Sequence, residues 1–129
     1  MRQDFDCYHE IKKKENNILN TIPFNSKRKR ASTVIQCPDD SSKVRIMLKG
    51  APEIVLQYCS SIINERGDTV SLSNSDKDSI MKDTVAAKFA RQAYRCILIA
   101  YKEISFDEYS SIKSSHNDFA KEDDREVLE

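Results

Sequence analysis

The sequence predicts an α+β domain in which a twisted, mainly antiparallel sheet has helices packed on it. Three observations predict this class. The β-branched run Ser32 to Ile35 and the alternating run Lys43 to Lys49 flank a turn rich in Pro, Asp and Ser, which is typical of a β-hairpin. Apolar residues recur at helical spacing up to Ala93, and a near-continuous apolar run follows it. At 129 residues the chain is expected to form one domain.

The first elements lead into this hairpin. The polar stretch from Arg2 to Asn16 has a partial helical stripe and predicts a short helix. Ile22 to Phe24 is expected to be an edge strand, because the proline between them cannot donate to a central ladder. Strands over Ala31–Cys37 and Lys43–Lys49 then bring the Phe24 side and the Lys49 side into one sheet.

Helices and strands alternate in the next part of the chain. Pro52 suits the first turn of a helix, which the apolar stripe extends to about Asn64. A turn at Gly67 precedes a short strand over Thr69–Leu72. Ser75 and Asp78 resemble a capping box and predict the start of the longest helix.

The last part begins with the apolar run, Tyr94 to Ile104, which predicts a central strand buried on both faces. Ser105 and Glu108 predict the cap of a helix over Phe106–Ser114. The segment His116–Glu129 is acidic and weakly periodic, and is expected to be a frayed helix or a segment that needs the rest of a larger protein.

Composition excludes several classes of function. The 21 basic and 21 acidic side chains give no net charge, which argues against a nucleic-acid module. Two glycines are too few for a Walker A loop or a dinucleotide fingerprint. The four cysteines stand singly, and neither histidine has ligands at metal-site spacing, so no metal site is expected. The chain contains no apolar run long enough to cross a bilayer, and no direct membrane insertion is expected.

Two features in the stretch from Ile22 to Glu53 indicate a ligand. Phe24 is followed by four consecutive cations, Lys27 to Arg30, and Lys49 precedes Gly50 at the end of the alternating run. An aromatic face suits a flat heterocycle, and cations without nearby acidic partners suit phosphates. The combination favours a nucleotide.

Three motifs then resemble the nucleotide-binding (N) domain of P-type ATPases, in the order found in that family. They are FNSKRKRAS from Phe24, KGAPE from Lys49 and YRCILIAYKEI, which contains Arg95. FNS with STVI, KGAPEIVL and the ending EDDREVLE look most like calcium pumps of the plasma-membrane type.

The resemblance implies a role for each matching residue. Phe24 would stack on adenine, and Lys49 would lie deep in the same pocket beside the base and ribose. Lys29 and Arg95 would reach the phosphates of ATP, while Gly50 and Ala51 would keep the pocket floor small. No catalytic residue is expected here, since the aspartate-bearing DKTGT loop does not occur.

The resemblance also implies a larger protein. Residues 1–20 would be an N-terminal helix and linker, 21–104 would form the ATP pocket, and 105–129 would lead to a phosphorylation domain. The fragment would bind ATP without hydrolysing it, and Mg²⁺ would enter with the nucleotide and the phosphorylation domain. Phosphorylation and transmembrane domains of the same parent chain would be its partners, and it would be a cytoplasmic domain of an integral membrane protein, in the plasma membrane.

Other interpretations remain open at this point. The RKR triplet and AYKEISFDEY also resemble phospholipid flippases of the same superfamily. A non-enzymatic module could bind acidic partners or anionic lipid through the basic run, which also resembles a nuclear-localisation patch. Phe24 could be a core residue. Lys29 to Ser32 resembles a basophilic kinase site, although a strand would hide the serine.

Overall fold

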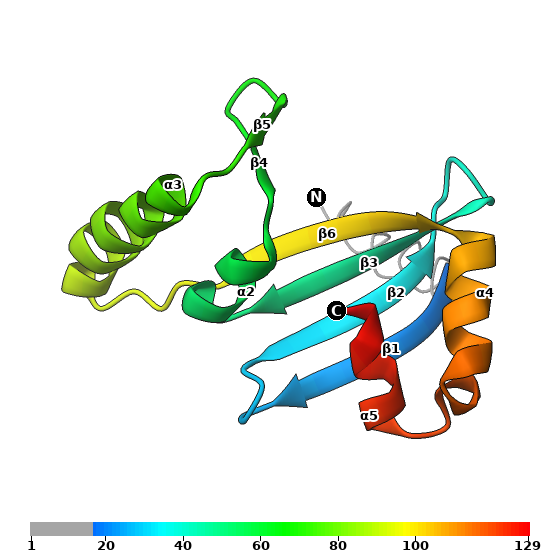
Figure 1. The fold of residues 1–129 in the computed structure, drawn as a ribbon. Helices are drawn as coiled ribbons and strands as arrows, with labels where there is room; N and C mark the ends of the chain where they lie inside the picture. Colours follow the sequence, from blue (N-terminus) through cyan, green and yellow to red (C-terminus); the bar gives the residue numbers. More distant parts are fainter. Residues whose placement is uncertain (1–16) are drawn as a thin grey trace, which may run out of the picture. The chain divides into compact units, whose positions relative to one another are not determined.

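The computed structural model describes residues 17–129, so the helix predicted over residues 2–16 lies outside the described residues. Four strands form one sheet in the order β1-β2-β3-β6, with neighbours antiparallel (Figure 1). Their bounds are β1 Ile18–Asn25, β2 Arg30–Gln36, β3 Lys43–Gly50 and β6 Leu98–Ser105. The α+β class and the β2-β3 hairpin are therefore confirmed, and β1 takes the edge position expected from Pro23.

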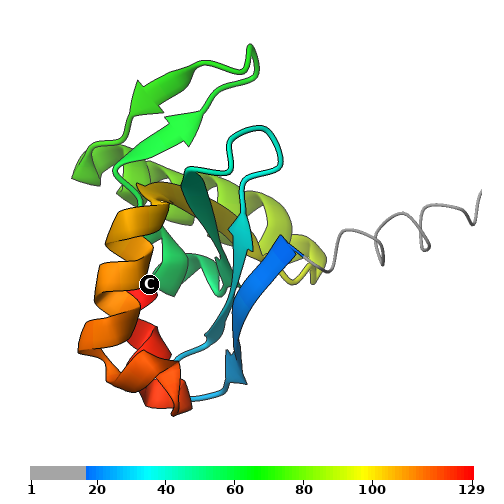
Figure 2. The ribbon, with the colours of Figure 1, turned by 90° about the vertical axis from the view of Figure 1, so that its right-hand side faces the viewer.

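Two compact units divide the chain. The described part of the first unit comprises residues 17–23, 32–47 and 101–129. Its helices are α4 (Phe106–Ser115) and α5 (Glu122–Arg125), followed by a 3₁₀ turn over Glu126–Leu128. They cover one face of the strands (Figure 2). The core consists of Val34, Val44 and Ile46 from the strands and Tyr109, Phe119 and Leu128 from the helical segments.

Aromatic packing and a cross-strand ion pair define this first unit. The rings of Tyr109 and Phe119 lie 5.9 Å apart between centroids. On β3, Arg45 donates to Oε1 of Glu103 on β6 at 2.6 and 2.8 Å, and its guanidinium lies over the ring of Tyr101. Since side chains on neighbouring strands meet only in one register, this contact favours the observed alignment of β3 with β6.

The second unit comprises Phe24–Ala31 and Leu48–Ala100. Helix α2 (Pro52–Tyr58) is shorter than predicted, because Cys59 is already extended and Ser61–Ile63 forms β4. β4 pairs with β5 (Thr69–Ser71) around the predicted turn at Gly67, with Ile62 opposite Val70. The prediction that α2 extends to Asn64 was wrong, since the β-branched pair at 62–63 is used in this hairpin.

The cap of helix α3 (Asn74–Ser79) lies two residues earlier than the predicted Ser75. Ser73 is the cap, and its hydroxyl accepts from the amide of Asp76 while that carboxylate accepts from the Ser73 amide. The helix continues through wide, π-type turns over Ile80–Phe89 and a 3₁₀ turn over Ala90–Gln92. It ends at Ala93, whose φ of 60° is left-handed. No side chain of these helical segments is buried.

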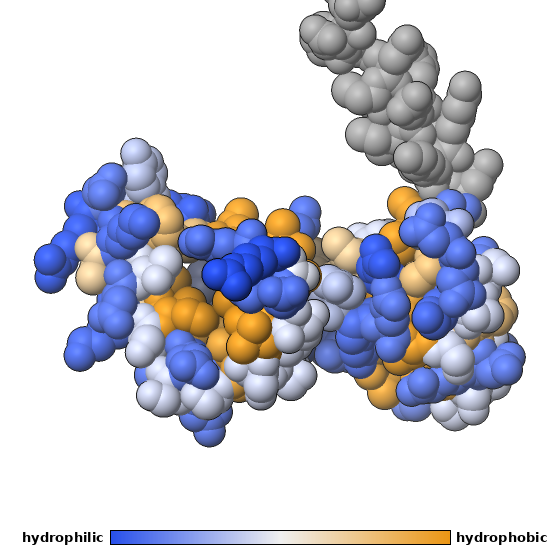
Figure 3. Space-filling model, turned by 90° about the horizontal axis from the view of Figure 1, so that it is seen from above, coloured by the Kyte–Doolittle hydropathy of each residue, from blue (hydrophilic) through white to orange (hydrophobic). Residues whose placement is uncertain are grey.

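The prediction of a central strand over 94–104 was wrong. β6 is an edge strand of the described sheet, with β3 as its neighbour on one side. Ile97 and Ile99 are 67% and 69% exposed, so alternate residues of the run face solvent within the described part of the chain. Space-filling Figure 3 shows apolar side chains reaching the surface between polar ones on the face that it draws.

Candidate functional site

All six residues predicted to bind a ligand belong to the second unit. β1 ends at Asn25, β2 begins at Arg30, β3 ends at Gly50 and β6 begins at Leu98. Because neighbouring strands are antiparallel (Figure 1), these four positions lie at the same end of the sheet. The topology therefore places the chain segments that carry Phe24, Lys29, Lys49 and Arg95 at one sheet end.

The turn between β1 and β2 is held by hydrogen bonds to the backbone and side chain of Asn25. The amide of Lys29 donates to the carbonyl of Asn25 at 2.6 Å, and the Asn25 side chain accepts from the amide of Lys27 at 2.8 Å. Lys29 has a φ of 56°, which is a left-handed backbone conformation that residues other than glycine adopt at a cost in free energy. The turn therefore fixes where the Lys29 side chain leaves the main chain.

The same turn is bonded to the start of the KGAPE motif. The amide of Ala51 donates to the carbonyl of Lys29 at 3.0 Å. A Cβ on Gly50 would lie 2.5 Å from that carbonyl oxygen and 2.8 Å from Cβ of Arg30. Gly50 has no positive φ, so glycine is required here for close approach rather than for backbone conformation. The junction of Lys29, Gly50 and Ala51 thus joins two motifs about twenty residues apart.

Phe24 is 65% exposed, which excludes the interpretation that it is a core residue. Lys49 and Arg95 are also exposed. The expectation that Lys49 lies deep in a pocket therefore does not hold in this structure. Among the described residues these three side chains have no hydrogen bond, ion pair or ring contact. An aromatic face and two cations at this sheet end are therefore available to a ligand.

Two cations of the basic run are engaged within the unit. Nζ of Lys29 lies 3.9 Å from Oε1 of Glu53, which corrects the expectation that these cations have no acidic partner nearby. The guanidinium of Arg30 lies 5.1 Å from the ring centroid of Tyr58. Sequence reasoning missed Glu53 and Tyr58 as contacts, because both depend on the path of the turn rather than on spacing within a motif.

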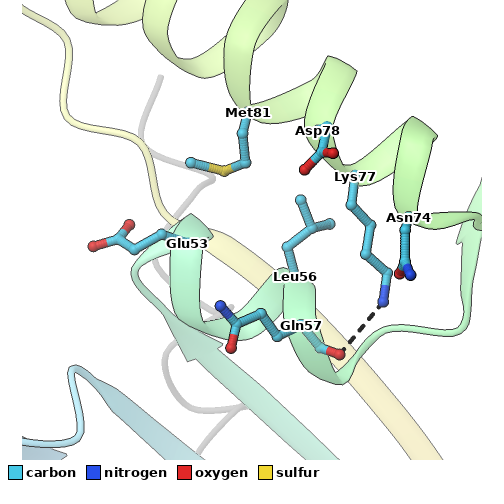
Figure 4. A pocket seen from close by; sticks show the side chains of 7 residues that line it. All are labelled: Glu53, Leu56, Gln57, Asn74, Lys77, Asp78 and Met81. Carbon is cyan, nitrogen blue, oxygen red and sulfur yellow. Dashed lines mark hydrogen bonds between the residues drawn. The ribbon is translucent and has the colours of Figure 1, made fainter.

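A hollow of about 360 Å³ lies between α2 and α3 and is lined by Glu53, Leu56, Gln57, Asn74, Lys77, Asp78 and Met81. Figure 4 shows Leu56 and Met81 on its apolar side and Nζ of Lys77 bonded to the carbonyl of Gln57, at 3.4 Å. None of the six predicted residues lines this hollow. Glu53 lines this hollow and also lies 3.9 Å from Nζ of Lys29.

The pKa shifts of the second unit have local causes. Hydrogen bonds from the side chain and amide of Ser73 lower the pKa of Asp76. Burial raises the pKa of the Cys59 thiol, which disfavours the thiolate form. The described residues contain no group of three or more His, Cys, Asp or Glu side chains placed to hold a metal ion.

Comparison with known proteins decides the family. The sequence model described as P-type ATPase, cytoplasmic domain N, matches residues 1–129, which is the whole chain. The chain belongs to this family. Expectations drawn from the three motifs about the family and the fold class are thereby confirmed.

The N domain is similar to parts of plasma-membrane calcium pumps. It is 34% identical over 84% of its length to plasma membrane calcium-transporting ATPase 4 of Bos taurus, and 32% identical over 95% to ATPase 4 of Homo sapiens. It is 40% identical over 74% of its length to plasma membrane calcium-transporting ATPase 2 of Oreochromis mossambicus. The chain spans 9% of the length of each of these curated relatives. No helix in the described part of the chain has the length and apolar character needed to cross a membrane.

Proposed function

We propose that this N domain binds ATP at the sheet end where β1 and β3 finish. The exposed ring of Phe24 carries the proposal, because a phenylalanine side chain 65% open to solvent gains apolar contact when a flat base covers it. The unengaged cations Lys49 and Arg95 in the same unit support it, since a nucleotide joins an aromatic base to anionic phosphates.

The residue roles follow from this placement. Phe24 stacks on adenine, and Lys49 contacts the base and ribose side. Arg95 binds phosphate as a bidentate donor, and Lys29 reaches the phosphates from the turn. Gly50 and Ala51 shape the site through their backbone, and Gly50 leaves room for the turn that carries Lys29.

In a longer protein this domain would position ATP for transfer of the γ-phosphate to an aspartate outside the chain. Mg²⁺ would come with the nucleotide and be held by the phosphorylation domain. Calcium is the proposed cargo and the plasma membrane the proposed location, because the similar proteins are named as plasma membrane calcium-transporting ATPases. This also favours a calcium pump over a lipid flippase.

A nuclear magnetic resonance titration of the 129-residue chain tests the binding site. ATP, AMP and inorganic triphosphate are compared at equal ionic strength. We expect ATP to shift resonances of Phe24, Lys49 and Arg95, with a higher affinity than inorganic triphosphate. Equal binding of ATP and inorganic triphosphate would contradict adenine stacking on Phe24.

Lys49→Ala separates the two ends of the nucleotide. If Lys49 lies beside the base and ribose, the substitution weakens AMP and ATP alike. A loss confined to ATP would place the lysine at the phosphates instead. Lys82→Ala is a matched control, because it removes another exposed lysine of the same unit outside the sheet end.

The competing hypothesis is a module that binds acidic partners through residues 27–30. The structure disfavours it, because Lys29 is close to Glu53 and Arg30 lies over Tyr58, so the run is not a uniform strip of free cations. Shifts of similar size with heparin and with ATP, centred on residues 27–30, would support this module.

A further inference from the structure

We infer that Glu53 is a built-in competitor of the nucleotide phosphates for Lys29, and that it sets the affinity and phosphate selectivity of the site. The inference rests on the proposed ATP site. It assigns to Glu53 a role beyond its favourable place in the first turn of α2.

The backbone brings the two charges together. The carbonyl of Lys29 accepts from the amide of Ala51, and Glu53 follows Ala51 by two residues. Close approach at Gly50 keeps the turn against this point. The 3.9 Å separation of Nζ and Oε1 is therefore a consequence of how the two motifs are joined.

The side chains remain free to separate. The side chains of Lys29 and Glu53 are 56% and 51% exposed, so the pair is solvated and weak. In the close-up of the hollow, the Glu53 carboxylate points away from Asn74 and Lys77 (Figure 4). Within the described residues Lys29 is its ion-pair partner. The Lys29 ammonium can thus exchange the carboxylate for a phosphate without a change in the backbone.

This exchange makes binding selective. A ligand gains from Lys29 only if its phosphates outcompete the carboxylate, so a triphosphate is favoured over a monophosphate. When the terminal phosphate leaves, Glu53 can pair with Lys29 again, which weakens retention of the diphosphate product. The carboxylate therefore lowers affinity for every phosphate that reaches Lys29.

Glu53→Gln tests the inference, with Glu65→Gln as the control. Glu65 is an exposed glutamate of the same unit, in the turn between β4 and β5, so both substitutions remove one negative charge. We expect Glu53→Gln to tighten ATP binding about 1.4-fold to fivefold at low salt, as the measured range for exposed ion pairs implies. AMP binding should be unchanged, and the gain should shrink at about 1 M salt, where the Debye length falls to about 3 Å.

A double-mutant cycle and a measurement without nucleotide complete the test. In a Lys29→Gln background, Glu53→Gln should no longer affect ATP binding. In the free domain, Glu53→Gln should shift the Lys29 side-chain resonances, while Glu65→Gln should not. Unchanged or weaker ATP binding by Glu53→Gln, an equal gain in Glu65→Gln, or a gain that persists without Lys29 would overturn the inference. If the unsubstituted domain does not bind ATP at all, the proposed function fails as well.

Discussion

Replacing Gly50 by alanine should push the β1-β2 turn away from the KGAPE motif. The new Cβ would lie 2.5 Å from the carbonyl oxygen of Lys29 and 2.9 Å from Cα of Arg30. Ordinary contacts begin at 3.4 Å, so the turn must move by about 0.9 Å. Both contacts are with backbone atoms, and a change of side-chain rotamer cannot relieve them. The shift also stretches the 3.0 Å hydrogen bond from the amide of Ala51.

We expect Gly50→Ala to lower the free energy of unfolding by about 2 to 4 kcal/mol. About 1 to 3 kcal/mol comes from overpacking and about 1 kcal/mol from the weakened hydrogen bond. Urea denaturation measures this as a lower midpoint with an unchanged slope. An ATP titration below the transition should show weaker binding, because Lys29 is displaced.

Gly67→Ala is the matched control for this prediction. Gly67 has a φ of 87° and no heavy atom within 4 Å of an added Cβ, so the cost is confined to backbone strain in the β4-β5 turn. We expect a loss of about 1 to 2 kcal/mol with ATP binding unchanged. The reasoning fails if Gly50→Ala is as stable as the parent chain and binds ATP equally well.

Other predictions concern binding, capping and burial. Phe24→Ala should weaken ATP by about 1 to 3 kcal/mol in a calorimetric titration and leave inorganic triphosphate unaffected. Ser73→Ala should cost about 1 kcal/mol in thermal unfolding, because it removes the cap of α3. The lowered pKa of Asp76 predicts stability that is present above about pH 4 and lost as pH falls through the depressed value, a dependence that Ser73→Ala should reduce in acid titrations. Ser32→Ala should cost about 1 to 2 kcal/mol in urea denaturation, since Ser32 is 3% exposed and its hydroxyl donates to the Glu129 carboxylate at 2.5 Å. Because Ser32 is buried, a kinase should phosphorylate it only in the unfolded chain.

Local sequence was sufficient for the β2-β3 hairpin. The alternation of Val44, Ile46 and Leu48 predicted β3, and the structure buries all three side chains. The turn before it joins β2 to β3 as expected. A hairpin is specified by the period of two and by turn residues, and both can be read within about twenty residues.

Predictions that depended on which segment pairs with which were less successful. The apolar content of residues 94–104 indicates burial on both faces, but it does not say which strands lie beside the run. Ile62 suited the apolar stripe of a helix, yet it pairs with Val70 in β4-β5. Periodicity alone does not separate a helix end from a short strand, and here pairing with a residue eight positions along the chain decides in favour of the strand.

For the candidate site, the motifs predicted which residues to examine but not how they interact. Phe24 was assigned by its place in a motif, and the structure leaves its side chain exposed. The contact between Lys29 and Glu53 could not be predicted, because it depends on the left-handed turn at Lys29 and on the missing Cβ at Gly50. Both are properties of the folded backbone.

The structure gives Gly50 a second explanation that experiment can separate from the first. If its small size serves the pocket floor, Gly50→Ala should weaken AMP and ATP alike and leave the free energy of unfolding nearly unchanged. If it serves the junction with Lys29, the substitution should destabilise the domain and weaken ATP more than AMP, since the displaced lysine serves the phosphates. The 2.5 Å approach to a backbone carbonyl favours the junction. A loss of ATP binding at Gly50 is therefore evidence for direct nucleotide contact only when stability and AMP binding have been measured in the same variant.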